Sequence, residues 1–312
     1  MTEHRKPGTW GRVRGRLGFG LSGAASENAW LGRWLVLPAL ALTGVLVVYP
    51  IIVGLSTSVH EATPTLGTPS PFVGLENYRE VLEQPSVGDS TVQTIFYVLT
   101  ALVLEIGLGL AIAVLLHRTF RGRGIVLAIL ILPWALPSVV SGVLWRRIFD
   151  PDTGLLNSVL VQTQIIDQPH VWLADQGWAT LFITLVHVWG VLPLVTLVFI
   201  AGLQAIPDEV YSASAVDGAS PWRQFRHITL PLLRPSLLVA LVVGTVNAIN
   251  IFDEIYVLNG TALNTRSILM EVYTTTFANG EFAEGIALAF MVALATALLA
   301  AFYGLVLRRR TV

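Results

Sequence analysis

The sequence predicts an all-α membrane protein with six transmembrane helices. Apolar residues make up 54% of its 312 residues and charged residues only 12%, with a mean hydropathy of +0.69, whereas a soluble domain carries roughly 25% charged residues. Six separate stretches approach or exceed the about 20 apolar residues that cross a bilayer. These stretches are continuous, unlike the alternating strands of a transmembrane barrel. Helices, which satisfy their own backbone hydrogen bonds, are therefore expected.

The six predicted spans follow one another along the chain, with polar connections between them. They cover residues 35–58, 91–116, 124–145, 178–203, 235–258 and 285–307. The first apolar run is longer than the 7–15 residues of a signal peptide and follows a polar tail, so it is expected to stay uncleaved. Pro133, Pro137 and Pro193 are predicted to kink their helices.

The basic residues predict the orientation of the spans, because positively charged loops stay in the cytoplasm. Fifteen of the 19 Lys and Arg residues lie in segments that six spans would leave on one side, namely 1–34, 117–123, 204–234 and 308–312. Both termini are therefore predicted to be cytoplasmic. The segment 1–34 is interpreted as a basic tail that sets topology rather than as a regulatory or lipid-binding arm, and 308–312 as a short C-terminal tail.

Composition and missing motifs exclude several function classes. A formal net charge of −1 is unlike that of a nucleic-acid-binding domain, and the absence of cysteine removes thiolate metal sites and cysteine nucleophiles. No H-E-x-x-H motif or Ser, His and Asp grouping stands at readable spacing, so no catalytic residue and no metal site is expected. The sole lysine, Lys6, precedes Pro7, which excludes the G-x-x-x-x-G-K-[ST] phosphate-binding loop. This chain is therefore expected neither to hydrolyse ATP nor to hold a cofactor.

The long cytoplasmic connection at 204–234 has the pattern of two short helices joined by a hinge. Pro207 suits a first helical turn, and Gly218 can take the positive φ that ends a helix. Ser220 and Pro221 form a cap and first-turn pair that opens a second helix. A simple amphipathic linker needs no such definition, so a docking element for a cytoplasmic partner is favoured.

The spacing in this loop resembles the "EAA" signature of ABC-importer permease subunits. In that pattern Glu-Ala-Ala is followed by three residues, a glycine, nine residues and Ile-x-Leu-Pro, and 212–218 with 228–231 fit it position by position. The segments 72–78, 132–137, 145–157 and 252–258 also resemble segments of the family. Residues 35–307 are most similar to the maltose-type (MalF/UgpA-like) sugar permease group.

This resemblance implies a type I ABC importer transmembrane-domain fold over 35–307 in a prokaryotic inner (cell) membrane. It implies four further partners besides membrane lipid: a second homologous permease that forms a heterodimer, two copies of a cytoplasmic ABC ATPase that bind ATP and Mg, and an extracytoplasmic substrate-binding protein. The implied function is ATP-driven import of a neutral sugar, a di- or oligosaccharide.

The resemblance also implies which loop residues contact the ATPase: Glu209, Ser212, Ala213, Ser214, Asp217 and Gly218. The glutamate of the family pattern is replaced here by Ser212. Glu209 lies three residues earlier on the same helical face, and our hypothesis is that it supplies the missing anionic contact.

For the substrate, the resemblance points to two spans. Asn247 and Asn250 stand three residues apart on the fifth span, and their amides offer donors and acceptors for sugar hydroxyls. Interhelical hydrogen bonding is the alternative for this pair. On the fourth span the matching positions are His187, Trp189, Gly190, Val191 and Leu194. Trp189 could stack on a sugar ring, while His187 is equally compatible with a packing role.

Charge within the spans bears on the substrate and on the energy source. Apart from Arg146 and Arg147 at the outer boundary, no basic residue lies within them, and an anionic ligand would require such a partner. A neutral sugar is therefore favoured, with glycerol-3-phosphate, a glycerophosphodiester or a polyol as alternatives. Glu105 would be the ion-coupling group of a secondary transporter, but a structural role between helices is favoured. An intramembrane enzyme is the most remote hypothesis.

Overall fold

The computed structural model describes residues 34–61, 70–262 and 265–308, so the predicted tails lie almost wholly outside the described residues. Contacts divide the chain after Gly54 into two units, which are described separately. The described part of the first unit, residues 34–54, is an apolar helix in which the π-helical turn η1 (Gly44–Val48) leads into α2 (Tyr49–Ser58), and the last four residues of α2 belong to the second unit.

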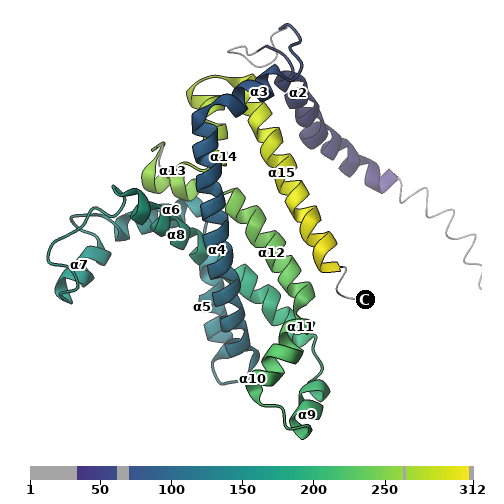
Figure 1. Cartoon of the computed structure of the whole chain (residues 1–312), viewed down its shortest axis with the longest axis vertical. Helices are drawn as coiled ribbons and strands as arrows, with labels where there is room; N and C mark the ends of the chain where they lie inside the picture. Colours follow the sequence, from purple (N-terminus) through teal and green to yellow (C-terminus); the bar gives the residue numbers. More distant parts are fainter. Residues whose placement is uncertain (1–33, 62–69, 263–264, 309–312) are drawn as a thin grey trace, which may run out of the picture. The chain divides into compact units, whose positions relative to one another are not determined.

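The all-helical membrane fold is confirmed in the described part of the chain. Four continuous helices are long and apolar enough to cross a bilayer, and two bent helix pairs raise this number to as many as six. The continuous helices are Trp34–Ser58, α4 (Pro85–His117), α8 (Gln176–Gln204) and α15 (Phe282–Arg308). The bent pairs are α5 (Arg123–Ala135) with α6 (Ser138–Ile148), and Pro221–Leu232 with α12 (Arg234–Ile249). Figure 1 shows α4, α12 and α15 as long inclined rods of the second unit.

The third predicted span is not a straight helix. Its two halves, α5 and α6, meet at an angle of 99°. The break lies at Leu136, whose ψ of 139° is extended, because the residue before a proline is disfavoured in helical conformation. Pro137 therefore breaks this helix, whereas Pro133 lies inside α5 and α8 continues through Pro193.

The prediction of a fifth span over 235–258 is wrong for its last third. Helix α12 ends at Ile249, residues 250–252 are not helical, and a separate helix α13 (Asp253–Asn259) follows. Two acidic residues begin α13, where the positive end of a helix favours them. The charged pair that we placed at the end of a continuous span therefore begins a new helix.

The core of the second unit forms where α4 packs against α8 and both contact α12. One buried cluster contains Phe199 and Leu203, and another contains Tyr97, Ile183 and Met270. Close approach of α4 and α8 depends on Gly109, because a Cβ atom there would lie 3.0 Å from a methyl group of Val195. Small residues permit such close packing in membranes.

Short helices join the long ones. They are α3 (Glu76–Glu83), α7 (Leu155–Gln162), α14 (Ile268–Tyr273) and the π-helical η4 (Thr274–Ala278). Helix α3 contacts α4 and α15, and α14 lies against the same two helices. Residues 72–78, one of the segments with family resemblance, are held by Asn77, which donates to the carbonyls of Ser58 and His60 at 2.9 and 2.7 Å.

The loop between α8 and α12 contains α9 (Asp208–Val216), α10 (Pro221–Gln224), the π-helical η2 (Phe225–Thr229) and α11 (Leu230–Leu232). Gly218 has a φ of +74°, which favours glycine, and the Ser220 side chain accepts from the Arg223 amide as the cap of α10. Pro207 precedes α9 as its capping residue instead of lying in the first turn.

Candidate functional site

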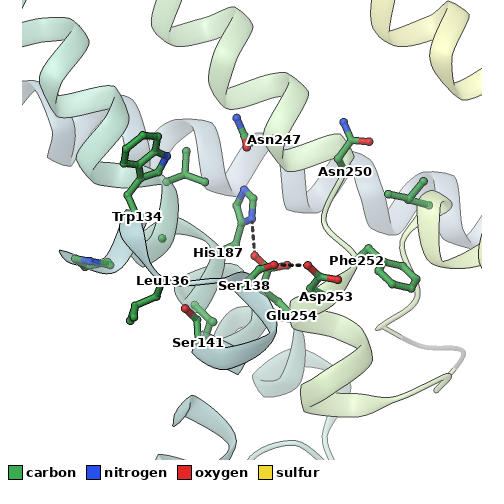
Figure 2. Close-up of a pocket in the computed structure, with 15 residues that line it drawn as sticks. Trp134, Leu136, Ser138, Ser141, His187, Asn247, Asn250, Phe252, Asp253 and Glu254 are labelled. Atoms are coloured by element: carbon green, nitrogen blue, oxygen red, sulfur yellow. Dashed lines mark hydrogen bonds and ion pairs between the residues drawn. The ribbon is translucent and has the colours of Figure 1, made fainter. Parts of the chain in front are cut away.

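A cavity of about 490 Å³ opens where the two helix breaks face each other and α8. The break between α5 and α6 contributes one part of its lining, and the break between α12 and α13 contributes another (Figure 2). The lining residues are Pro133, Trp134, Leu136, Ser138, Ser141, Val186, His187, Gly190, Val191, Asn247, Asn250, Phe252, Asp253, Glu254 and Leu269. No Lys or Arg is among them, so the cavity wall combines apolar surface with hydrogen-bonding and acidic groups.

Asn247 and Asn250 are exposed to this cavity. Their amide nitrogens donate to the carbonyls of Val243 and Val246 at 2.8 and 2.7 Å. In the described chain their Oδ1 atoms accept no hydrogen bond, so both are available to a ligand hydroxyl. Asn250 lies just after the last residue of α12, because the helix ends earlier than we predicted.

Three ionisable side chains, Glu254, His187 and Glu105, lie in a row from the cavity to the protein interior. Nδ1 of His187 lies 3.2 Å from Glu254 Oε1, and Nε2 lies 3.6 Å from Glu105 Oε1. Glu105 is fully buried, and its oxygens have no hydrogen-bond partner within the described residues. Figure 2 shows the His187 ring directed at the Glu254 carboxylate. His187 thus bridges α4, α8 and α13.

Gly244 of α12 leaves the space that the Glu105 side chain occupies. A Cβ atom at Gly244 would lie 2.6 Å from Glu105 Oε2 and 2.8 Å from a methyl group of Leu102. Any larger residue would therefore displace Glu105 or move α12 away from α4.

A second polar contact joins the two helix breaks. Ser138, the first residue of α6, donates to Asp253, the first residue of α13. The same helices pack closely at Gly142, where a Cβ atom would lie 2.9 Å from the Cβ of Val257. Sequence reasoning did not identify Ser138, Asp253 or Glu254 as site residues. The available signal was the acidic pair at the end of an apolar run.

The predicted substrate residues divide into two groups in the structure. His187, Gly190, Val191, Asn247 and Asn250 line the cavity, while Trp189 and Leu194 are not part of its lining. Trp189 instead makes an edge-to-face contact with Trp145, with ring centroids 5.6 Å apart. Leu194 is half-buried on α8.

The predicted coupling residues lie on α9 and the turn after it. Glu209, Ser212, Ala213, Asp217 and Gly218 are exposed, and Ser214 is half-buried. The Ser212 hydroxyl donates to the Asp208 carbonyl at 3.0 Å, along its own helix. Glu209 lies in the first turn of α9, and its side chain is exposed to solvent.

Three side-chain contacts join α9 to the segment after the hinge, one of them a hydrogen bond from Gln224 Nε2 to the Tyr211 carbonyl at 3.3 Å. Gln224 Nε2 donates to Ser214 Oγ at 2.9 Å, and the hydroxyl groups of Tyr211 and Thr229 lie 3.0 Å apart. These contacts hold the two halves of the loop as one element despite the glycine between them.

Hydrogen bonds between its own residues stabilise the connection after α6. Asn157 is 3% exposed and contacts Pro151, His170 and Trp172. The backbone amide and hydroxyl of Thr153 donate to Asp150 Oδ1 at 2.8 and 2.9 Å. They hold the pKa of the Asp150 carboxyl below its usual range. This segment resembles the family in sequence, and its polar residues organise the fold of the connection.

The fold and the sequence together define a class of protein. Residues 105–312 match the family described as binding-protein-dependent transport system inner membrane component. The chain belongs to this family, as an ABC-importer permease subunit of the MalF/UgpA type, and is a multi-pass protein of the inner membrane.

Several relatives are similar over most of their length. The trehalose/maltose transport system permease protein MalF of Thermococcus litoralis is 38% identical over 75% of this chain and 78% of its own. The sn-glycerol-3-phosphate transport system permease protein UgpA of Agrobacterium fabrum is 35% identical, over 81% and 86%. A bacterial ABC transporter for the import of alginate superposes with a TM-score of 0.81, covering 94% of this chain and 99% of that one. At 20% identity this likeness is one of fold.

Proposed function

We propose that this chain forms the membrane pathway of an importer that moves a neutral di- or oligosaccharide into the cytoplasm. The observation that carries this proposal is the cavity at the helix breaks, which offers the free amide oxygens of Asn247 and Asn250 beside two carboxylates, with no Lys or Arg in its lining. Sugar hydroxyls donate readily to such oxygens. The ring of Trp134 adds an aromatic surface of the kind that packs against sugar rings.

The names of the relatives support this substrate class, although not all of them are named for a neutral sugar. The permease of Thermococcus litoralis is named for trehalose and maltose, and a Mycobacterium tuberculosis relative, 31% identical, is named for trehalose. Others are named for sn-glycerol-3-phosphate and sulfoquinovosyl glycerol. Asp253 and Glu254 in the lining repel an anionic substrate, so a neutral sugar is favoured over glycerol-3-phosphate.

ATP hydrolysis is assigned to separate subunits. In this proposal two ABC ATPases bind ATP and Mg, and one of them contacts α9 and the turn after it. A second permease completes the pathway and receives the other ATPase. The contact residues in this chain are Glu209, Ser212, Ala213, Ser214, Asp217 and Gly218. An extracytoplasmic binding protein delivers the sugar. The side-chain contacts between the two halves of the loop support a role for α9 as a rigid element. Movement of the ATPases on closure would then move α9 and, with it, the spans.

This arrangement requires α9 on the cytoplasmic side. The distribution of basic residues supports that orientation, with six crossings and both termini in the cytoplasm. Each bent helix pair then counts as one crossing.

Co-purification tests the assembly. We expect the tagged chain, extracted in mild detergent from its native membrane, to bring down an ABC ATPase, a second permease and a binding protein, identified by mass spectrometry. Recovery of the chain with no nucleotide-hydrolysing subunit would contradict the proposal. A variant with residues 209–218 scrambled is the matched control, and it should lose the ATPase while keeping the second permease.

A further inference from the structure

One group behind the cavity-lining His187 is left unexplained by the proposed function. Glu105 is a carboxylate at the middle of a span, fully buried and without a hydrogen-bond partner in the described chain. A polar group in such a position is costly and is usually functional. The nearby group that can compensate it is His187 Nε2, at 3.6 Å.

His187 is held by a hydrogen-bond contact on one side and has a second carboxyl group close by on the other. Its two ring nitrogens face carboxylates from different helices, Glu105 of α4 and Glu254 of α13. The contact with Glu254, at hydrogen-bond distance, and the neighbouring Glu105 carboxyl favour this orientation of the ring. Because the side chain is only 4% exposed, little room is left for direct contact with a ligand.

Of the three side chains Glu105, His187 and Glu254, Glu254 is the one that can contact a ligand. Its Oε1 atom is engaged by His187, and the side chain is 14% exposed, so the carboxylate keeps acceptor lone pairs within reach of a ligand. The carboxylate lines the cavity together with Asn250 and Asp253 (Figure 2). A carboxylate oxygen accepts only, so the matching ligand group is a donor such as a hydroxyl.

We propose that Glu254 is a further substrate-binding residue that accepts a hydrogen bond from a sugar hydroxyl, and that His187, backed by Glu105, is the positioning residue that aims it. The proposal rests on the proposed function. It gives His187 an indirect role in place of the direct contact predicted from sequence. It also explains why α12 has a glycine at 244, since a side chain there would push Glu105 away from His187.

The test is a double-substitution cycle on the complete transporter in proteoliposomes, at saturating binding protein. The variants are Glu254→Gln, His187→Ala and the double variant, and the readout is disaccharide delivered per ATP hydrolysed. Each single variant should deliver about tenfold less sugar per ATP, the scale by which a hydrogen bond to a well-placed charged acceptor exceeds one to a neutral acceptor. The double variant should fall within about twofold of either single variant, because both remove the same interaction.

Controls separate this role from simple misfolding. Glu83→Gln removes an exposed carboxylate that pairs with Arg79 on α3, and it should deliver sugar like the wild type. If His187→Ala fails to assemble, His187→Gln replaces it, and its retained donor should leave more sugar per ATP than loss of the Glu254 carboxylate.

Two results would overturn the proposal. One is a Glu254→Gln transporter that delivers sugar per ATP like the wild type. The other is a double variant about a hundredfold below wild type, which would mean that the two residues act independently. Failure of the wild-type transporter to import any neutral disaccharide would instead refute the proposed function, whatever the variants do.

Discussion

Asparagines in two regions of the molecule have opposite hydrogen-bond states. In the connection after α6, Asn157 donates to the carbonyls of Pro151 and His170 and accepts from the His170 amide and from Trp172 Nε1. At the cavity, Asn247 and Asn250 each donate once, to a carbonyl one turn earlier. The Asn157 amide is fully hydrogen-bonded within the fold, whereas the Asn247 and Asn250 amides have free oxygens that can accept from a ligand.

This difference teaches how to separate structural from ligand-binding amides in a membrane protein. A buried amide with every partner in place stabilises the fold, and removing it leaves other polar groups unpaired. An exposed amide with a free oxygen in a cavity contributes little to the fold. Substitutions in the two regions should therefore affect different measurements.

The largest effect is expected for Asn157→Ala. It leaves two backbone carbonyls, one amide and the Trp172 indole without their partner, which costs about 3 kcal/mol or more. With about 2 °C per kcal/mol for a domain of this size, the midpoint of thermal unfolding of the purified complex should fall by about 6 °C. Sugar uptake per assembled complex should be unchanged. An unchanged midpoint would contradict the structural role.

Asn250→Ala should give the reverse pattern. Uptake should fall about tenfold, the upper end for one neutral hydrogen bond, because the free Oδ1 at the cavity is lost. The unfolding midpoint should shift by less than about 1 °C. Asn247→Ala is the parallel variant. If either substitution lowered the midpoint as Asn157→Ala does and spared uptake, that asparagine would belong with the structural group.

The comparison extends to α9, where Glu209 is exposed. If its free carboxylate serves the ATPase, Glu209→Ala should lower coupled uptake about fivefold, the scale of one ion pair. Adding Ser212→Glu, which restores the family pattern, should recover most of that loss. Equal uptake in the wild type and Glu209→Ala would contradict the substitution hypothesis.

The smallest effect is expected for Asp150 in the same connection as Asn157. Because its pKa is lowered in the folded protein, its contribution is present above the unfolded value of about 3.9 and is lost as the pH falls through the folded value. The unfolding midpoint should drop slightly on acidification from pH 7 to below about pH 4. Asp150→Asn should lack this component, measured in parallel scans. A similar acid-induced drop in both proteins would rule the assignment out.

The sequence predicted the all-helical membrane class, because it follows from local composition. It predicted a kink at Pro137 but not the full break of the helix at Leu136, and it did not predict the break at 250–252. Both depend on local conditions inside an apolar run, a proline in one case and an acidic helix start in the other. A hydropathy window averages over such features.

The site was predicted less completely than the fold. Asn247 and His187 were identified, but Glu254 was not, and Trp189 packs on Trp145 away from the cavity lining. Glu105, His187 and Glu254 lie on three different helices. Only tertiary packing brings them together, so spacing along the chain gives no signal for their contact.

The most direct test of the account is energised uptake by the complete transporter in proteoliposomes. Labelled neutral disaccharide should accumulate only when ATP, the binding protein and hydrolysis-competent ATPase subunits are all present, and a proton ionophore should have no effect. Accumulation that continues with a hydrolysis-deficient ATPase and collapses with the ionophore would contradict the account and indicate an ion-coupled carrier.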